Sequence, residues 1–200
     1  IDSVLEQVER DVRLINELEL KLKYLLETHV HADHITGVTS LKKHFPGVQS
    51  VFHTFGAECA DIHVKDGDIL QLGTLLIQVL ATPGHTDSCV SYHLPPRVFT
   101  GDALLIRGCG RTDFQQGDAK KLYHSVTQKL FTLPAQTLVY PAHNYLGATC
   151  SSIAEEKKYN PRLANKTQEE FVNIMADLNL DPPRKMMESV PANLQCGQID

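Results

Sequence analysis

The stretch Thr28-His29-Val30-His31-Ala32-Asp33-His34 is the most informative part of this chain, because it places three imidazoles and one carboxylate within six consecutive positions. Imidazole nitrogen is a common ligand of Zn, Fe, Cu and Ni, and a carboxylate adds charge and a harder oxygen donor. A hydrophobic core gains nothing from neighbouring histidines, and a solvated loop does not need them. The pattern therefore predicts a metal site rather than a His-rich surface loop.

Composition limits the classes of protein to which the chain can belong. It has 200 residues, of which 42% are hydrophobic and 22% charged, and a net charge of −5. These values are typical of a globular protein with one sizeable core. The sequence contains no basic stripe that would predict a nucleic-acid partner. It also contains no polybasic cluster or long apolar run that would predict a membrane partner.

The cysteines predict a reducing environment. There are five of them, an odd number, and none forms a C-x-x-C pair. This argues against a disulfide framework and favours an intracellular setting.

The apolar pattern predicts helices and strands mixed around one core. A short apolar strand over residues 22–26 leads directly into the His-rich stretch. Capping signals at Asp118 and at Thr167-x-x-Glu170 predict two later helix starts. The tail from Asp181 contains prolines and is expected to be irregular. The other predicted elements are helices over residues 4–18 and 35–45, strands over 51–53, 89–94, 98–100 and 137–140, and a hairpin over 69–80 that turns at Gly73.

Three more candidate ligands follow predicted strands, in Gly84-His85, Gly101-Asp102 and Ala142-His143. Each is weak alone, since a single His or Gly-Asp after a strand is usually a turn residue. All three nevertheless end strands as His29 does, and strand ends in a layered sheet lie along one edge. Their side chains can therefore converge. The remaining histidines lack this context and are assigned no metal role: His44, His53, His63, His93 and His124.

This order, H-x-H-x-D-H, Gly-His, Gly-Asp and a late His, resembles the metallo-β-lactamase superfamily over nearly the whole chain. The resemblance implies an α/β (α+β) fold, a four-layer αββα sandwich with two mixed β-sheets and a metal site along one edge. Dinuclear members hold their first metal with residues matching His29, His31 and His85. They hold the second with residues matching Asp33, His34 and His143, and Asp102 bridges the two metals.

A narrower resemblance concerns the segment from Gly101 to Gln115, which contains Arg107-Gly108-Cys109-Gly110-Arg111-Thr112-Asp113-Phe114. It is similar to the persulfide dioxygenase branch, the ethylmalonic encephalopathy protein family. Three further segments agree: Tyr140-Pro141-Ala142-His143, Asn160-Pro161-Arg162-Leu163, and Val190-Pro191-Ala192-Asn193 followed by Cys196-Gly197. The implied reaction is oxidation of glutathione persulfide by O₂ and water to sulfite and glutathione, a step of hydrogen sulfide catabolism.

The same resemblance implies one Fe(II) per subunit, held by His29, His85 and Asp102. Such a 2-His-1-carboxylate triad leaves positions open for O₂ and substrate. Around these ligands, His31, Asp33, His34 and His143 would orient the ligands and bind iron-bound water or substrate.

A glutathionyl substrate carries carboxylates, for which Arg111 and Arg162 are the candidate partners. Each arginine could equally brace its own loop. Tyr145 could donate a hydrogen bond to substrate, or it could be half-buried in a turn. Cys109 is expected to be a buried, inert thiol. The family usually carries Asp after the late His, where this chain has Asn144.

The resemblance further implies a single domain over residues 1–200 that lacks its N-terminal strands, with residues 160–200 as a short extension. Members are mitochondrial in eukaryotes and cytoplasmic in bacteria, and homodimers occur. Two alternatives stay open. One is a glyoxalase-II-like hydrolase of glutathione thioesters with a dinuclear site, and the other is a metal-binding or redox-sensing module without turnover.

Overall fold

The computed structural model describes residues 1–199 and divides into two compact units. The first unit comprises Ile1–Val64 together with the C-terminal residues from Asp181 onward, and the second comprises Lys65–Leu180. Within the described residues, no helix has the length and apolar character needed to cross a membrane.

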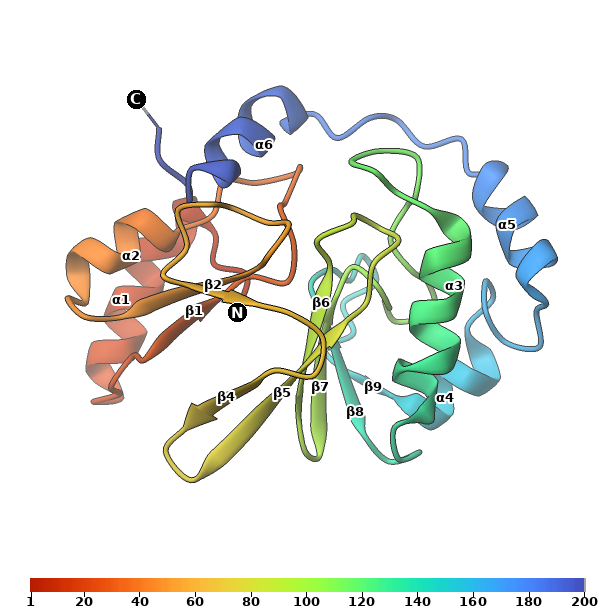
Figure 1. The fold of residues 1–200 in the computed structure, drawn as a ribbon, viewed down its shortest axis with the longest axis horizontal. Helices are drawn as coiled ribbons and strands as arrows, with labels where there is room; N and C mark the ends of the chain where they lie inside the picture. The colour runs from red at the N-terminus through yellow and green to blue at the C-terminus, as the bar shows by residue number, and fades with distance from the viewer. Residues whose placement is uncertain (200) are drawn as a thin grey trace. The chain divides into compact units, whose positions relative to one another are not determined.

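The first unit is built on a parallel sheet of three strands in the order β1-β2-β3 (Figure 1). Two helices lie beside this sheet, and their apolar residues form one core with Leu25 and Phe52 of the strands. This core fixes the end of β1, from which the His-rich stretch begins. The elements are η1 (Leu5–Gln7), α1 (Val8–Glu17), β1 (Tyr24–Leu26), α2 (Val38–His44), β2 (Gln49–His53) and β3 (Ile62–Val64).

The chain ends in a helix, α6 (Met186–Leu194), which also belongs to the first unit. The expectation of an irregular tail is therefore wrong. Pro191 lies inside α6, and a proline normally breaks or kinks a helix because it lacks an N–H donor. Here burial of Ala192 and Asn193, and three hydrogen bonds of the Asn193 side chain to the backbone of residues 31, 34 and 36, hold the helix in place.

A disulfide joins Cys59 to Cys196, across 137 positions of sequence. This bond runs against the expectation of a chain without disulfides, which came from five cysteines that lack a C-x-x-C pair. Cysteine spacing carries no information on a pair that only the fold brings together. Cys89, Cys109 and Cys150 remain thiols.

The second unit contains a six-stranded sheet in the order β4-β5-β6-β7-β8-β9. All neighbours are antiparallel except β7 and β8, whose parallel pairing places the ends of these two strands at the same edge. The strands are β4 (Ile69–Leu72), β5 (Leu75–Ala81), β6 (Val90–Leu94), β7 (Arg97–Gly101), β8 (Leu138–Pro141) and β9 (Ser151–Ser152). The predicted hairpin is confirmed, and Gly73 adopts the left-handed φ of 62° at its turn.

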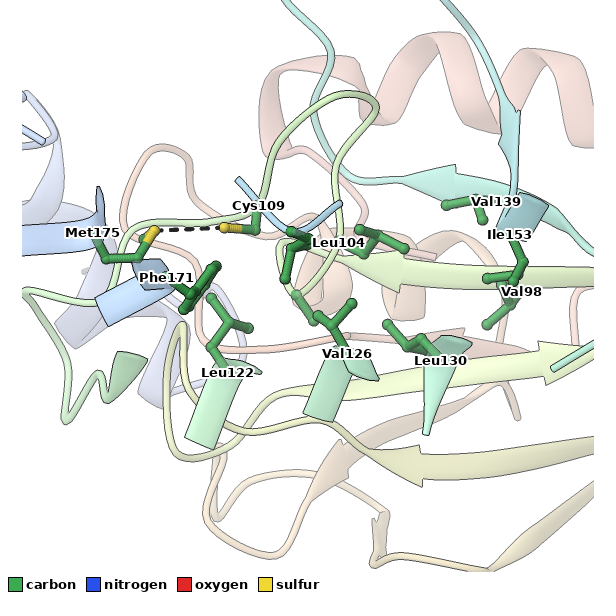
Figure 2. Packing of buried hydrophobic residues seen from close by; sticks show 12 residues of the cluster. Val98, Leu104, Cys109, Leu122, Val126, Leu130, Val139, Ile153, Phe171 and Met175 are labelled. Carbon is green, nitrogen blue, oxygen red and sulfur yellow. Dashed lines mark hydrogen bonds between the residues drawn. The ribbon is translucent and has the colours of Figure 1, made fainter. Parts of the chain in front are cut away.

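Three main helices of this unit pack against the sheet through one apolar cluster (Figure 2). Leu122 and Val126 come from α3 (Ala119–Gln128), Ile153 from α4 (Ile153–Tyr159), and Phe171 and Met175 from α5 (Gln168–Ala176). A short 3-10 turn, η2 (Leu130–Thr132), follows α3.

Helix starts in this unit follow from side-chain caps. The predicted cap at Asp118 is confirmed, because its carboxylate accepts the backbone N–H of Lys121. The predicted capping box is also confirmed, since Thr167 and Glu170 bond reciprocally. Strands β3 and β9 and helix α4 were not predicted, because each is too short to show a clear periodicity.

Candidate metal centre

The His-rich stretch follows β1, and His29 is its first imidazole. His29 is buried, and its Nδ1 lies 2.9 Å from the hydroxyl of Thr28. That hydroxyl donates its only proton to the Asp2 carboxylate at 2.9 Å, so it accepts from His29 Nδ1–H. The proton therefore sits on Nδ1, and Nε2 is the ring nitrogen with the lone pair needed to bind a metal.

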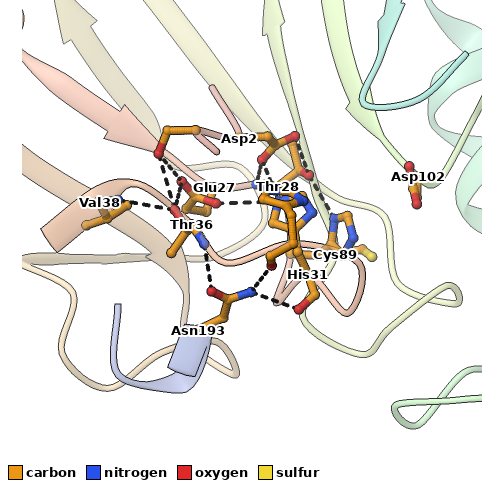
Figure 3. A network of polar contacts seen from close by, with 12 residues as sticks. Asp2, Glu27, Thr28, His31, Thr36, Val38, Cys89, Asp102 and Asn193 are labelled. Atoms are coloured by element: carbon orange, nitrogen blue, oxygen red, sulfur yellow. Dashed lines mark hydrogen bonds and ion pairs between the residues drawn. The ribbon is translucent and has the colours of Figure 1, made fainter. Parts of the chain in front are cut away.

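The buried His31 lies between the carboxylates of Asp2 and the buried Glu27, as Figure 3 shows. Its Nε2 is 3.2 Å from Oδ1 of Asp2 and 3.4 Å from Oε2 of Glu27. Burial alone would lower the pKa of His31, but the Asp2 carboxylate outweighs it and raises that pKa to about 10. The pKa of Asp2 is lowered in turn, because the His31 imidazolium outweighs the effect of burial. The two groups form a buried ion pair that fixes the His31 ring.

The end of the His-rich stretch is held by the C-terminal helix. Asn193 of α6 donates from Nδ2 to the carbonyls of His31 and His34, each at 2.8 Å, and its Oδ1 accepts the N–H of Thr36 at 2.8 Å. His34 also contacts Asp33, with Nδ1 3.0 Å from Oδ2. His31, Asp33 and His34 can present ligand atoms within 4.8 Å of one another.

The second unit brings together His85, Asp102 and His143, the three candidates that follow strands β5, β7 and β8. His143 Nδ1 donates to Asp102 Oδ1 at 2.7 Å. His85 Nε2 lies 3.6 Å from Asp102 Oδ2, too far for a hydrogen bond. At this separation, the nitrogen and the oxygen can both bind one metal ion, because each metal–ligand bond is about 2 Å long.

The ring of His85 is oriented by a backbone carbonyl. Its Nδ1 donates to the carbonyl of Arg111 at 2.7 Å, so the proton is on Nδ1 and the lone pair on Nε2. Gly110 packs directly beneath, where an added Cβ would lie 2.7 Å from His85 Nδ1 and 2.6 Å from the carbonyl of Asp102. Only glycine allows this close approach of the loop to both candidate ligands.

The arginines proposed for substrate already have protein partners. Arg111 makes a bidentate pair with Asp113, at 2.7 Å for each contact, and lies over the ring of Phe114. This pairing lowers the pKa of Asp113. Arg162 donates to the carbonyl of Cys109 at 2.7 Å. Each arginine therefore holds part of its own loop in this structure.

The loop after His143 is exposed. Tyr145 is 84% exposed, and its ring is nearly parallel to that of His143. It is thus not half-buried in a turn. Asn144 accepts two backbone N–H groups through Oδ1, from Leu146 and Ala148. An aspartate could accept the same two bonds, so Asn144 preserves this turn.

Cys109 is buried, and this burial raises the pKa of its thiol to about 11. The thiol lies 3.7 Å from the sulfur of Met175 (Figure 2). A thiol that stays protonated at neutral pH is a poor nucleophile, as expected for an inert residue.

Residues 1–143 match the family model of the Metallo-beta-lactamase superfamily. The chain is 53% identical over 199 residues to the human protein named persulfide dioxygenase ETHE1, mitochondrial, covering 98% of this chain and 78% of the human one. This chain belongs to the persulfide dioxygenase family. A crystal structure of ETHE1 from Myxococcus xanthus is 55% identical, with a TM-score of 0.97 over 98% of this chain and 87% of that one.

Membership of the persulfide dioxygenase family confirms the predicted fold class, a mixed α/β metallo-β-lactamase fold with two sheets. Hydroxyacylglutathione hydrolases are more distant relatives. The hydroxyacylglutathione hydrolase GloC of Haemophilus influenzae is 34% identical over 185 residues, covering 80% of this chain and 85% of that protein.

Several residues around the candidate ligands were missed by sequence reasoning. Asp2, Glu27 and Asn193 surround the His-rich stretch, and Gly110 lies against His85. Gly110 and Asn193 fall within segments that resemble the family, which is the only sequence signal for them. Asp2 and Glu27 carried none.

Proposed function

We propose that this chain is a persulfide dioxygenase that oxidises glutathione persulfide with O₂ and water to sulfite and glutathione. The observation that carries the proposal is the 53% identity to the human persulfide dioxygenase over 98% of this chain. The donor set adds chemical support, because two imidazoles and one carboxylate suit a non-haem iron that must keep open positions.

We assign His29, His85 and Asp102 as ligands of one Fe(II) per subunit. The support is the matched protonation of the two imidazoles. In each, Nδ1–H is tied to an oxygen of its own unit, the Thr28 hydroxyl or the Arg111 carbonyl. Nε2 of each ring therefore keeps the lone pair that binds the metal. A hydrogen bond from Nδ1–H also makes the imidazole a more basic metal ligand.

Bound iron would supply the redox chemistry that lets O₂ react with a sulfane sulfur, which Zn²⁺ cannot do. In the overall reaction, both atoms of O₂ are transferred to the terminal sulfur, and water cleaves the S–S bond. Sulfite and the thiol of glutathione leave, so the sulfane sulfur is the atom oxidised and O₂ is reduced.

The neighbouring residues of the chain would hold charge and orientation. His143 donates to Asp102 Oδ1, which directs the other carboxylate oxygen toward His85 Nε2. His31 stays fixed by Asp2 and Glu27. We assign His31, Asp33, His34 and His143 to this surrounding role rather than to direct iron ligation.

We further propose that Arg111, Arg162 and Tyr145 contact the substrate. Arg111 is the strongest candidate for the glutathionyl carboxylates, because its guanidinium already donates two parallel hydrogen bonds to the carboxylate of Asp113. Tyr145 is exposed beside His143 and can donate a hydrogen bond. A homodimer, and a mitochondrial matrix location in a eukaryotic host or a cytoplasmic one in bacteria, complete the proposal.

The deciding experiment measures metal content per chain and O₂ uptake with glutathione persulfide on the same preparation. We expect about one iron, little zinc and sustained uptake that His85→Ala abolishes. Two metals per chain with hydrolysis of a glutathione thioester would instead identify the dinuclear hydrolase. Metal binding without sustained uptake would identify a non-catalytic module.

A further inference from the structure

We propose that Glu156 and Asn160 are positioning residues for the metal centre, although neither lies beside a candidate ligand in sequence. They act through the backbone of residues 105–111, which are part of the connection between β7 and α3. This segment is called the GCG loop below, after its Gly108-Cys109-Gly110. The inference rests on the proposed function only in taking His85 and Asp102 as metal ligands.

Glu156 is a fully buried carboxylate in α4 that accepts hydrogen bonds from four donors. Two come from Arg107, its guanidinium and its backbone N–H, the latter at 2.8 Å. The others are the Ser151 hydroxyl at 2.6 Å and the Asn160 amide at 2.9 Å. A buried charge is tolerated only when it is paired and bonded in this way, so the carboxylate strongly fixes its partners.

Arg107 shows what this fixation achieves. It is a non-glycine residue with φ of 59°, in the left-handed region that side chains disfavour. A surrounding structure must hold such a conformation in place. Glu156 bonds both the backbone and the side chain of Arg107, and so sets the direction in which the GCG loop continues.

Asn160 and Arg162, which follow α4, hold the next two carbonyls. Asn160 Nδ2 donates to Gly108 O at 3.0 Å, and Arg162 donates to Cys109 O at 2.7 Å. Side chains of one short segment therefore fix three consecutive residues of the loop, from 107 to 109.

The next two residues of the loop contact the candidate ligands. Gly110 N–H donates to the carbonyl of Asp102 at 2.6 Å, and the Arg111 carbonyl accepts Nδ1–H of His85 at 2.7 Å. A shift of the loop would release Nδ1 of His85 and allow the other tautomer, in which Nε2 carries the proton and cannot bind a metal. Glu156 and Asn160 thus set the tautomer and the direction of the His85 ring, which they do not touch.

Glu155 provides a matched control. It is the adjacent carboxylate of the same helix and also contacts Arg107, at 3.2 Å, but its side chain is half-exposed. No hydrogen bond from the described loop backbone reaches it, since Arg107 N–H bonds Glu156 instead. Glu155→Gln removes the same charge from the same helix without releasing the loop.

The test is titration of metal-stripped full-length protein with Co²⁺, followed by its visible absorption, which reports ligand geometry as well as affinity. We expect Glu156→Gln to weaken Co²⁺ binding by about 10- to 100-fold and to change the spectrum, as loss of outer contacts to metal ligands does. Glu155→Gln should bind within about twofold of the parent protein with an unchanged spectrum. Asn160→Ser, a milder change, should show a smaller loss in the same direction.

A core variant separates positioning from general destabilisation. Val126→Ala removes buried volume from the second unit without touching the loop hydrogen bonds. Equal loss of Co²⁺ affinity in Val126→Ala and Glu156→Gln at equal loss of melting temperature would overturn the proposal. The proposal would also be overturned if Glu156→Gln bound Co²⁺ within about twofold of the parent protein and had an unchanged spectrum. If Glu156→Gln does not fold, the same criteria are applied to Asn160→Ser. Because Co²⁺ binding needs no turnover, failure of O₂ uptake in the parent protein would contradict the proposed function and leave this result standing.

Discussion

Removal of the Asn193 side chain should destabilise the protein far more than a surface asparagine does. Asn193 is 1% exposed and makes three side-chain hydrogen bonds, two to carbonyls of the His-rich stretch and one from Thr36 N–H. Each such bond contributes about 1 kcal/mol net, and a buried group left without a partner costs about 1–3 kcal/mol. Asn193→Ala should therefore lower the free energy of unfolding by about 3–5 kcal/mol.

Urea unfolding monitored by circular dichroism measures this loss, and Asn16→Ala is the matched control. Asn16 is an exposed asparagine of α1 in the same unit, so its replacement should change stability by less than about 0.5 kcal/mol. A loss below about 1 kcal/mol in Asn193→Ala would refute the reasoning, because it would mean that water replaces Asn193 at no cost. Retention of parent metal affinity would separately show that the His-rich stretch keeps its shape without the Asn193 hydrogen bonds.

The remaining predictions concern the second unit and the bound metal. Gly110→Ala should weaken Co²⁺ binding at least about tenfold by pushing on His85, whereas Gly108→Ala, with its nearest contact at 3.9 Å, should not. The Cys109 thiol stays protonated in the folded state up to a pKa of about 11, against 9.0 unfolded, so its contribution is intact below pH 9 and is lost as pH rises to 11. From pH 8 to pH 10.5, ionisation of Cys109 should therefore lower the free energy of unfolding in urea by about 2 kcal/mol. Cys109→Ala should remove this part of the drop, and an equal drop in both proteins would contradict the prediction. Thr167→Ala removes the capping box and should cost about 1 kcal/mol, which thermal unfolding can detect. Chelation of the proposed iron should lower the melting temperature, by an amount that grows with the logarithm of the metal affinity. An unchanged melting temperature would argue against a native-state metal site.

The candidate ligands could be predicted from sequence because their positions follow from strand ends. His85, Asp102 and His143 each come directly after an apolar run, and apolar runs identify strands. Parallel neighbours such as β7 and β8 then bring two of these ends to one edge. The capping box at Thr167 could also be predicted, because all its hydrogen-bonding partners lie within four residues.

What could not be predicted depends on contacts between distant parts of the chain. The Cys59–Cys196 bond and the bonds of Asn193 to the His-rich stretch span well over a hundred positions. The burial of Glu156 could not be predicted either, because an acidic residue in a Glu-Glu-Lys-Lys run predicts an exposed helix face. In each case, tertiary contacts outweigh the local signal.

The two arginines show why an activity loss alone would not identify a substrate contact. Arg162 bonds the carbonyl of Cys109, so its removal would shift the GCG loop and, through it, the orientation of His85. Arg111 is held by Asp113, and a substrate carboxylate would exchange with that partner rather than enter a vacant site. Because one carboxylate replaces another, the exchange should contribute little net affinity and mainly orient the substrate. Arg111→Ala should therefore lower kcat for glutathione persulfide with little change in KM and with unchanged metal affinity. Arg162→Ala also releases the Cys109 carbonyl, and should lower kcat and metal affinity together.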